Sequence, residues 1–296
     1  MIKQYTVNCG GKKEYIIDYM TGTLGFSGRK SKLLIKDRKV LINGKAAFRD
    51  SRLKDGDLLE LDLSEEAREE VVPENIGLNI VYEDDFMLVV DKPPFMLVHP
   101  TPNHQSGTLL NAVAYHFSKQ GIHTAVRLLN RLDMNTSGLV VVPKSSEIHS
   151  RLGEMMRKGE IKKCYTAIIE GSLSPEKGII DKAIDKDPDN PIKRKVMDQG
   201  QRAVTKYETI KEIKGYSILR LELVTGRTHQ IRVHLSHLGH PIVGDSLYGK
   251  ASPLIDRQAL HAYGMEFMHP VGGNTVKLHA ELPRDIEALI SEIESE

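Results

Sequence analysis

The stretch LLNRLDMNTSGLVVVPKS, residues 128–145, places Arg131 and Asp133 on a short polar turn between two apolar runs. An aspartate is ordinarily ionised at neutral pH, so Asp133 could act as a nucleophile or base without a second group to activate it. It needs a partner that fixes its direction, and the planar fork of arginine matches a carboxylate. The candidate arginines are Arg131, Arg227 and Arg232. The alternative is an ordinary surface ion pair between Arg131 and Asp133.

Arg227 and Arg232 lie in a second segment, LVTGRTHQIRVHLSHLGHPIVGDSLYG, residues 223–249. An alternating strand is expected to run there into a Gly-Arg-Thr turn and then into a helix, and such a junction directs side chains into a shared cleft. Histidines crowd the same segment, so a metal hydrolase is the sharp alternative. The segment has no HExxH pattern, and we expect these histidines to cap or pack rather than to bind metal. They are His229, His234, His237 and His240.

Strand-like runs and helical stretches are interspersed beyond residue 75. Several runs have the period-two alternation of a half-buried sheet, and helices are expected over residues 145–160 and 285–296. These features predict an α+β fold with a mixed, mainly antiparallel sheet. Residues 181–201 are rich in Asp, Pro and Lys without periodicity, which predicts a surface loop. The strand-like runs cover residues 78–84, 86–92, 138–144, 164–171 and 216–224.

The N-terminal part predicts a small basic domain. A short amphipathic helix is expected over residues 27–39, and Asn43-Gly44 between apolar runs predicts a hairpin. Residues 55–63 then predict a closing strand. Residues 1–63 resemble the S-four-like RNA-binding domain, which implies phosphate contacts from the helix rather than simple solvation of one of its faces. Its cationic residues are Arg29, Lys30, Lys32, Lys36, Arg38 and Lys39.

An acidic stretch separates this domain from the rest of the chain. SEEAREEVVPEN, residues 64–75, is expected to form a linker or a short exposed helix. The sequence therefore predicts an S-four-like domain over 1–63, a linker over 64–75 and a second domain over 76–296.

Five segments of the second domain resemble, in order, the RluA/RluD-type pseudouridine synthases. The resemblance extends over about residues 78–284 and implies isomerisation of uridine to pseudouridine in RNA, without a metal or cofactor. It also implies a central sheet split by the active-site cleft. The segments are VVDKPPFMLVHP, NRLDMNTSGLVVVPKS, KKCYTAIIEG, LVTGRTHQIRVHLSHLGHPIVGDSLYG and RQALHAYGMEFMHP.

The resemblance assigns roles to individual residues. Asp133 matches the catalytic aspartate, which attacks the ribose or assists its elimination, and Arg232 matches the arginine that pairs with it. Tyr165 matches a tyrosine placed against the uracil and proposed to help remove the proton from carbon 5. Ile231 matches an apolar residue beside the base. Arg131 matches a residue that fills the gap left by the flipped uridine.

The sequence departs from the family pattern in two places. Asn130 stands where a histidine commonly precedes Arg-Leu-Asp, and DKPPF replaces the more usual Asn-Lys-Pro-x-Gly. Because Arg131 and Asp133 are retained, the first departure affects the expected substrate choice more than the expected chemistry.

Composition limits the other function classes. Lys plus Arg number 41 against 40 Asp plus Glu, so an RNA surface must come from local clustering of charge. The two cysteines, Cys9 and Cys164, form no pair motif, and no segment is apolar enough for a signal peptide or a membrane span. We expect a cytoplasmic RNA-modifying isomerase that acts on ribosomal RNA, as the S-four-like domain favours. A transfer RNA substrate and an inactive RNA-binding assembly factor are the alternatives.

Overall fold

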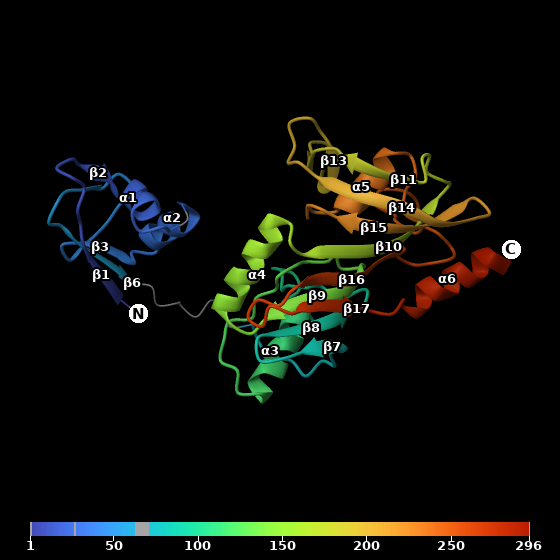
Figure 1. The fold of residues 1–296 in the computed structure, drawn as a ribbon, viewed down its shortest axis with the longest axis horizontal. Helices are drawn as coiled ribbons and strands as arrows, with labels where there is room; N and C mark the ends of the chain where they lie inside the picture. The colour runs from blue at the N-terminus through green and yellow to red at the C-terminus, as the bar shows by residue number, and fades with distance from the viewer. Residues whose placement is uncertain (1, 27, 63–70, 296) are drawn as a thin grey trace. The chain divides into compact units, whose positions relative to one another are not determined.

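The computed structural model describes residues 2–26, 28–62 and 71–295. The chain forms two compact units, Met1–Glu70 and Val71–Glu296. The division falls within the linker expected at 64–75, of which residues 64–70 lie outside the described part. No described helix is long and apolar enough to cross a membrane. Figure 1 shows the elements of each unit.

The first unit packs two helices against a small four-stranded sheet with the order β1-β6-β3-β4. Its core includes Ile16, Met20, Leu59 and Leu61. The predicted hairpin and closing strand are confirmed as β3, β4 and β6. The elements are β1 (Ile2–Thr6), β2 (Glu14–Tyr15), α1 (Ile16–Gly22), α2 (Gly28–Lys36), β3 (Val40–Ile42), β4 (Lys45–Ala46), β5 (Arg52–Leu53) and β6 (Leu58–Asp62).

The basic helix α2 is shorter than the sequence predicts. It ends at Lys36, and Arg38 has a left-handed backbone with φ 56°. The amide of Arg38 donates to the carbonyl of Ile35, and that of Lys39 to the carbonyl of Leu34. This pair of bonds is the Schellman arrangement that satisfies the last carbonyls of a helix. The prediction of helix at residues 37–39 was therefore wrong, and residue 27 lies outside the described part.

The second unit contains a nine-stranded sheet with the order β11-β14-β15-β10-β16-β9-β8-β7, and β17 also pairs with β16. Each pairing is antiparallel except that of β16 with β9, which confirms the predicted α+β class. The strands are β7 (Ile80–Glu83), β8 (Met87–Lys92), β9 (Ser137–Pro143), β10 (Lys162–Glu170), β11 (Lys177–Asp181), β14 (Val204–Ile213), β15 (Tyr216–Leu223), β16 (Leu260–Met268) and β17 (Thr275–His279).

Both faces of the central strands are buried. Along β8, Leu88 and Val90 join one core cluster, and Met87 and Val89 join another, because side chains alternate across a sheet. Helix α4 packs on the second cluster, and α3 and α6 contribute to the first. The helices predicted near residues 145–160 and 285–296 are confirmed. The bounds are α3 (Leu109–Lys119), α4 (Ser146–Lys158), α5 (Gln230–His237) and α6 (Arg284–Ser295).

The parallel contact between β9 and β16 is short and close. Only His261 with Ser137 and Ala262 with Gly138 are in register. Gly138 has φ 117°, and a Cβ atom there would lie 2.3 Å from the carbonyl oxygen of Ala262. Glycine is required because the two backbones meet directly, five residues after Asp133.

Residues 181–201 are not a loop. They contain a hairpin of β12 (Ile184–Asp187) and β13 (Asn190–Val196). Ile184 packs with Ala203 and Val233, so the hairpin is attached to α5. The prediction of a loop was wrong because Ile184 is the only buried residue within the described ranges 184–187 and 190–196, which removes the apolar alternation that normally marks a strand.

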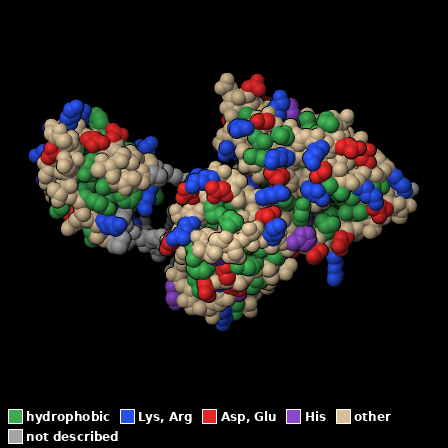
Figure 2. Space-filling model, in the orientation of Figure 1, with side chains coloured by type: hydrophobic (Ala, Val, Ile, Leu, Met, Phe, Trp, Pro, Cys, Tyr) green, Lys and Arg blue, Asp and Glu red, His purple; other side chains and the backbone are tan. Residues whose placement is uncertain are grey.

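The outer surface of β10, β14 and β15 carries cross-strand ion pairs. Lys206 lies 2.7 Å from Glu222, and Arg220 lies 3.2 Å from Glu208. Lysine and arginine side chains are accordingly mixed with carboxylates on the face of this unit shown in Figure 2. Lys162 also pairs with Glu222, and Lys177 of β11 pairs with Glu208, so four cations share two carboxylates in these ion pairs.

Candidate active site

Asp133 lies on the turn that leads into β9, a turn closed by a hydrogen bond from the amide of Thr136 to the carbonyl of Asp133. We refer to residues 133–136 as the Asp133 turn. The Asp133 carboxylate is partly exposed and accepts a hydrogen bond of 2.9 Å from Nη1 of Arg232. Strand β9 and helix α5 therefore bring together two residues that are far apart in sequence.

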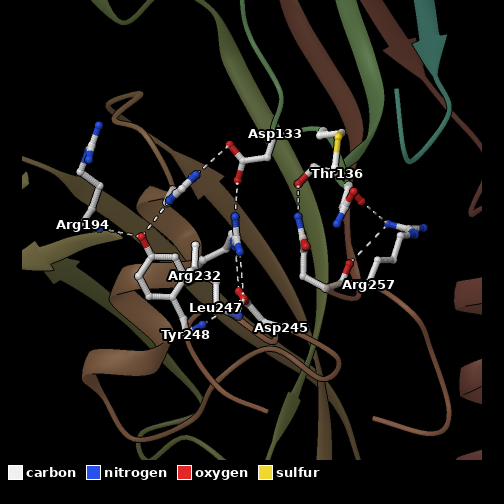
Figure 3. A network of polar contacts seen from close by, with 12 residues as sticks. Asp133, Thr136, Arg194, Arg232, Asp245, Leu247, Tyr248 and Arg257 are labelled. Atoms are coloured by element: carbon white, nitrogen blue, oxygen red, sulfur yellow. Dashed lines mark hydrogen bonds and ion pairs between the residues drawn. The ribbon is translucent and has the colours of Figure 1, made fainter. Parts of the chain in front are cut away.

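Arg232 is buried and holds two carboxylates. Its Nε and Nη2 donate to the two oxygens of Asp245 at 2.7 and 2.9 Å, which leaves Nη1 for Asp133. Burial opposes the charge of this guanidinium, but the hydrogen bonds and charges of Asp245 and Asp133 raise the pKa of Arg232. Figure 3 shows the three side chains in a row. Arg232 is thus a permanently charged and rigidly oriented partner for Asp133.

Asp245 is in turn fixed by the backbone that follows it. Its Oδ1 accepts hydrogen bonds from the amides of Leu247 and Tyr248, both at 3.1 Å. The guanidinium of Arg232 lies 5.0 Å from the centre of the Tyr248 ring. Asp245 and Tyr248 were not predicted as site residues, although both lie in the segment of residues 223–249. Because a buried carboxylate is almost always paired, the presence of Arg232 thirteen positions before Asp245 could have suggested this ion pair.

Tyr248 also connects His229 and the β12–β13 hairpin. Its hydroxyl accepts a hydrogen bond from the amide of Arg194 at 2.8 Å and lies 2.8 Å from Nδ1 of His229. Burial lowers the pKa of His229, against the opposing effect of the charge of Asp133. A neutral ring that accepts the Tyr248 proton at Nδ1 carries its own proton on Nε2, which is 3.8 Å from Oδ1 of Asp133.

Tyr165 of β10 is buried in the same core cluster as Leu132 and Ile231, which flank Asp133 and Arg232 in the sequence. Burial, followed by the charge of Asp133, raises the pKa of the Tyr165 hydroxyl. Tyr165 is therefore a neutral phenol close enough to Asp133 to sense its charge. Ile231 is buried beside it, as expected for an apolar wall.

The other two candidate arginines do not reach Asp133. Arg131 and Arg227 are both exposed, and neither makes an ion pair with Asp133 within the described part of the chain. Arg227 instead donates from Nε to the carbonyl of Arg202 at 3.1 Å. The prediction that Arg227 contributes to the same site receives no support from these contacts. The cationic residues of α2 belong to the first unit and are described only within it.

Three buried side chains donate hydrogen bonds to the Asp133 turn. Nζ of Lys92 donates to the carbonyl of Met134 at 3.0 Å, and Nη1 of Arg257 donates to that of Asn135 at 3.0 Å. The amide nitrogen of Gln258 donates to the hydroxyl of Thr136 at 3.1 Å. Each residue that follows Asp133 in the turn is thus fixed by a different side chain.

Asn130 has a structural role. Its side chain donates to the carbonyl of Leu139 at 2.9 Å and accepts from the amide of Val141 at 3.0 Å. It therefore attaches the chain before the Asp133 turn to the edge of β9. The side chain that replaces the usual histidine is buried at this strand and occupied by these bonds.

The histidines of residues 229–240 have ordinary partners. His234 is buried between the Thr205 hydroxyl and the Lys182 carbonyl, and His240 lies 3.0 Å from the carbonyl of Glu170. Within the ranges that the structure describes, no group of three or more His, Cys, Asp or Glu side chains could hold a metal ion. His234 and His240 therefore pack and hydrogen-bond within the fold.

The chain is similar to known RNA pseudouridine synthases. A family model described as RNA pseudouridylate synthase matches residues 86–237. The uncharacterized RNA pseudouridine synthase YhcT of Bacillus subtilis (strain 168) is 40% identical over 267 residues, which cover 88% of each chain. Ribosomal large subunit pseudouridine synthase D of Escherichia coli (strain K12) is 35% identical over 282 residues, which cover 90% of this chain and 86% of that one.

A solved structure shows the same fold. Human RNA Pseudouridylate Synthase Domain Containing 4 superposes with a TM-score of 0.60 over 73% of this chain and 92% of that one, at 23% identity. The fold and the relatives together define an RNA pseudouridylate synthase, an isomerase that converts uridine in RNA to pseudouridine. Within that class, the chain belongs to the RluA/RluD-type family.

Proposed function

We propose that this enzyme isomerises uridine in large-subunit ribosomal RNA and that Asp133 is its catalytic residue. The observation that carries the proposal is the Asp133–Arg232–Asp245 arrangement, in which a partly exposed carboxylate is oriented by a buried arginine. The choice of RNA is supported by the names of several relatives, which are ribosomal large subunit pseudouridine synthases.

The reaction exchanges one glycosidic bond for another. The bond between N1 of uracil and C1′ of ribose breaks, the base turns over, and C5 bonds to C1′; C5 loses a proton and N1 gains one. We propose that Asp133 either attacks the ribose or assists its elimination. Arg232 fixes the direction of the carboxylate throughout, so the geometry for both bond changes is set before the RNA binds.

Tyr165 and Ile231 would confine the detached uracil. Both side chains are buried, and an aromatic ring and an aliphatic wall suit a flat base that must rotate without escaping. As a neutral phenol, Tyr165 can take the proton of carbon 5 only when its own proton is removed. One cause of its raised pKa is the charge of Asp133, and that cause disappears when Asp133 is bonded to the ribose.

We propose that the first unit binds the RNA through α2 and the residues that follow it. Lys32, Lys36 and Arg38 are exposed there, and Lys30 lies 5.1 Å from the centre of the Phe26 ring. Lys39 follows at the start of β3, and the backbone of Arg29 belongs to α2. A cluster of one sign on a short helix fits phosphate contact.

The test is tritium release from RNA labelled at carbon 5 of uridine, with unmodified ribosomal and transfer RNA supplied separately. Wild-type enzyme is expected to release tritium from ribosomal RNA, and Asp133→Asn should abolish release while RNA binding persists. Asp198→Asn, at an exposed carboxylate, is the matched control and should remain active. Turnover by Asp133→Asn would refute the role of Asp133, and release from transfer RNA alone would refute the choice of RNA.

A further inference from the structure

Phe95 has a backbone conformation that phenylalanine rarely adopts. Its φ is 62°, in the left-handed region that favours glycine. A bulky residue held there strains the chain, and such strain persists where the surroundings enforce it and commonly marks a functional site. The Phe95 side chain is 56% exposed, so packing within the protein gives it little compensation.

The loop that carries Phe95 is tied to the Asp133 turn. Buried Lys92 donates from Nζ to the carbonyls of Pro93 at 2.7 Å, Met96 at 3.0 Å and Met134 at 3.0 Å. One ammonium group thus joins the chain on both sides of Phe95 to the residue directly after Asp133. The strained residue is therefore held beside the proposed catalytic carboxylate.

Arg131 acts electrostatically on the far end of this loop. Burial and then the charge of Arg131 lower the pKa of His99, four residues after Phe95. Arg131 and Met134 flank the Leu132–Asp133 pair and are both exposed, Met134 by 45%. We refer to Phe95, Arg131 and Met134 as the rim. These exposed residues carry an aromatic ring, a planar cation and an apolar chain on the two segments that Lys92 joins next to Asp133.

We infer that Phe95 stacks on a nucleobase of the substrate RNA close to the target uridine and is a binding determinant of this enzyme. A nucleobase is the partner that fits, because exposed aromatic rings and planar cations are the groups on which proteins stack unstacked bases. Flipping the uridine exposes the faces of the neighbouring bases, and a stacked ring replaces the contact that those bases lose. The inference rests on the proposed role of Asp133.

The first experiment uses the absence of tryptophan from the chain. Phe95→Trp combined with Asp133→Asn gives one indole at the rim in a protein that binds RNA without converting it. Unmodified large-subunit ribosomal RNA should quench this fluorescence in proportion to the RNA bound, as measured by filter retention. Ile179→Trp in the same background is the control, since Ile179 is 64% exposed on the edge strand β11. Full binding without quenching at position 95 would overturn the inference.

The second experiment separates stacking from packing, because the two roles predict different changes in the melting temperature and in KM for the RNA. Phe95→Gly and Phe95→Asn relieve the left-handed strain, so the melting temperature should rise by about 2 °C or more. Both variants lose the ring, so KM for the RNA should rise about five-fold or more, whereas Phe95→Tyr should retain the wild-type KM. A lower melting temperature with an unchanged KM would mean that Phe95 is a packing residue and would overturn the inference.

The outcomes distinguish this inference from the function on which it rests. Asp133→Asn that still turns over refutes the role of Asp133 whatever happens at position 95. Asp133→Asn that is inactive, with Phe95→Gly at wild-type KM, refutes the stacking of Phe95 alone. Ribosomal RNA that fails to bind the wild-type enzyme refutes the choice of RNA, whatever happens at position 95.

Discussion

At the scale of single residues, the site places one guanidinium between two carboxylates. Arg232 lies between Asp133 and Asp245, so one positive charge serves two carboxylates and the group of three keeps a net negative charge. The bidentate bond goes to the buried Asp245, and the single bond goes to the exposed Asp133. Asp133 thus retains one oxygen without a bond from Arg232, as the proposed attack on the ribose requires.

Asp245→Asn tests whether this order matters. The variant removes the charge that fixes Arg232, so the direction of Asp133 should loosen and kcat should fall about ten- to hundred-fold, with KM for RNA nearly unchanged. Asp84→Asn is the control, because Asp84 also accepts several hydrogen bonds but belongs to a separate cluster with His269. Equal kcat losses in the two variants would mean that Asp245 acts only through general stability.

Lys92 makes a pH dependence measurable. Burial lowers its pKa from 10.5 to about 7, so between these values the unfolded chain binds more protons and the contribution of Lys92 to stability rises with pH. Compared with Lys92→Met, the wild type should gain up to about 1.4 kcal/mol per pH unit in that window. Urea unfolding at pH 6, 7, 8 and 9 measures the difference. A constant difference would show that the folded lysine keeps its ordinary pKa.

The sequence identified some of these residues but not others, for a physical reason. Asp133 and Arg232 stand in motifs whose residue types already suggest an oriented carboxylate. Asp245, Lys92 and Arg257 act through carbonyl, carboxylate and backbone contacts that only the tertiary structure brings together. A charged residue read from sequence is expected to be exposed, so buried positioning groups are the ones most easily missed.

At the scale of elements, the β12–β13 hairpin is connected to the site by the Tyr248 hydroxyl and by the packing of Ile184 on Val233 of α5. The amide of Arg194 donates to Tyr248, whose ring lies beside Arg232. The sequence predicted most strands of the large sheet because they alternate or are apolar throughout. It failed for this hairpin, whose only buried residue is Ile184 within the described ranges 184–187 and 190–196.

Tyr248→Phe should loosen the contact between the β12–β13 hairpin and the site. The variant keeps the ring but leaves the Arg194 amide without its acceptor, which should lower the unfolding free energy by about 1 kcal/mol. Hydrogen exchange at Arg194 should accelerate, while exchange along β14 and β15 stays unchanged. Tyr207→Phe is a matched control, since the Tyr207 hydroxyl donates to the carbonyl of Pro175 instead. Slow exchange at Arg194 in Tyr248→Phe would show that strand pairing alone protects this amide.

At the scale of the whole molecule, charge is distributed unevenly although the total is only +1. On the exposed sheet face of the second unit Glu208 and Glu222 pair with lysines and an arginine, whereas α2 and the residues after it are mainly cationic. Electrostatic attraction of RNA is therefore expected to depend on the first unit more than its size suggests.

Replacing Lys32, Lys36 and Arg38 together by Gln tests this expectation. The affinity for unmodified ribosomal RNA should fall, and the slope of log affinity against log salt should decrease in magnitude by about two, because fewer counterions are released. Lys12, Lys13 and Lys54 replaced by Gln give the same charge change elsewhere in the same unit. An identical salt slope in both triple variants would show that the net charge of the first unit governs binding, and not the positions of Lys32, Lys36 and Arg38.

The bond from Arg257 to the Asp133 turn has a consequence for the order of synthesis. Arg257 is fully buried and is itself held by both oxygens of Asp285, in the first turn of α6. Translation proceeds at about 5–20 residues per second, so roughly 8–30 seconds separate Asp133 from Asp285 on the ribosome. Until then Arg257 lacks its counter-charge, and the turn that carries Asp133 lacks one of its supports. The growing chain therefore exposes α2, the helix proposed to bind RNA, well before it completes the candidate active site.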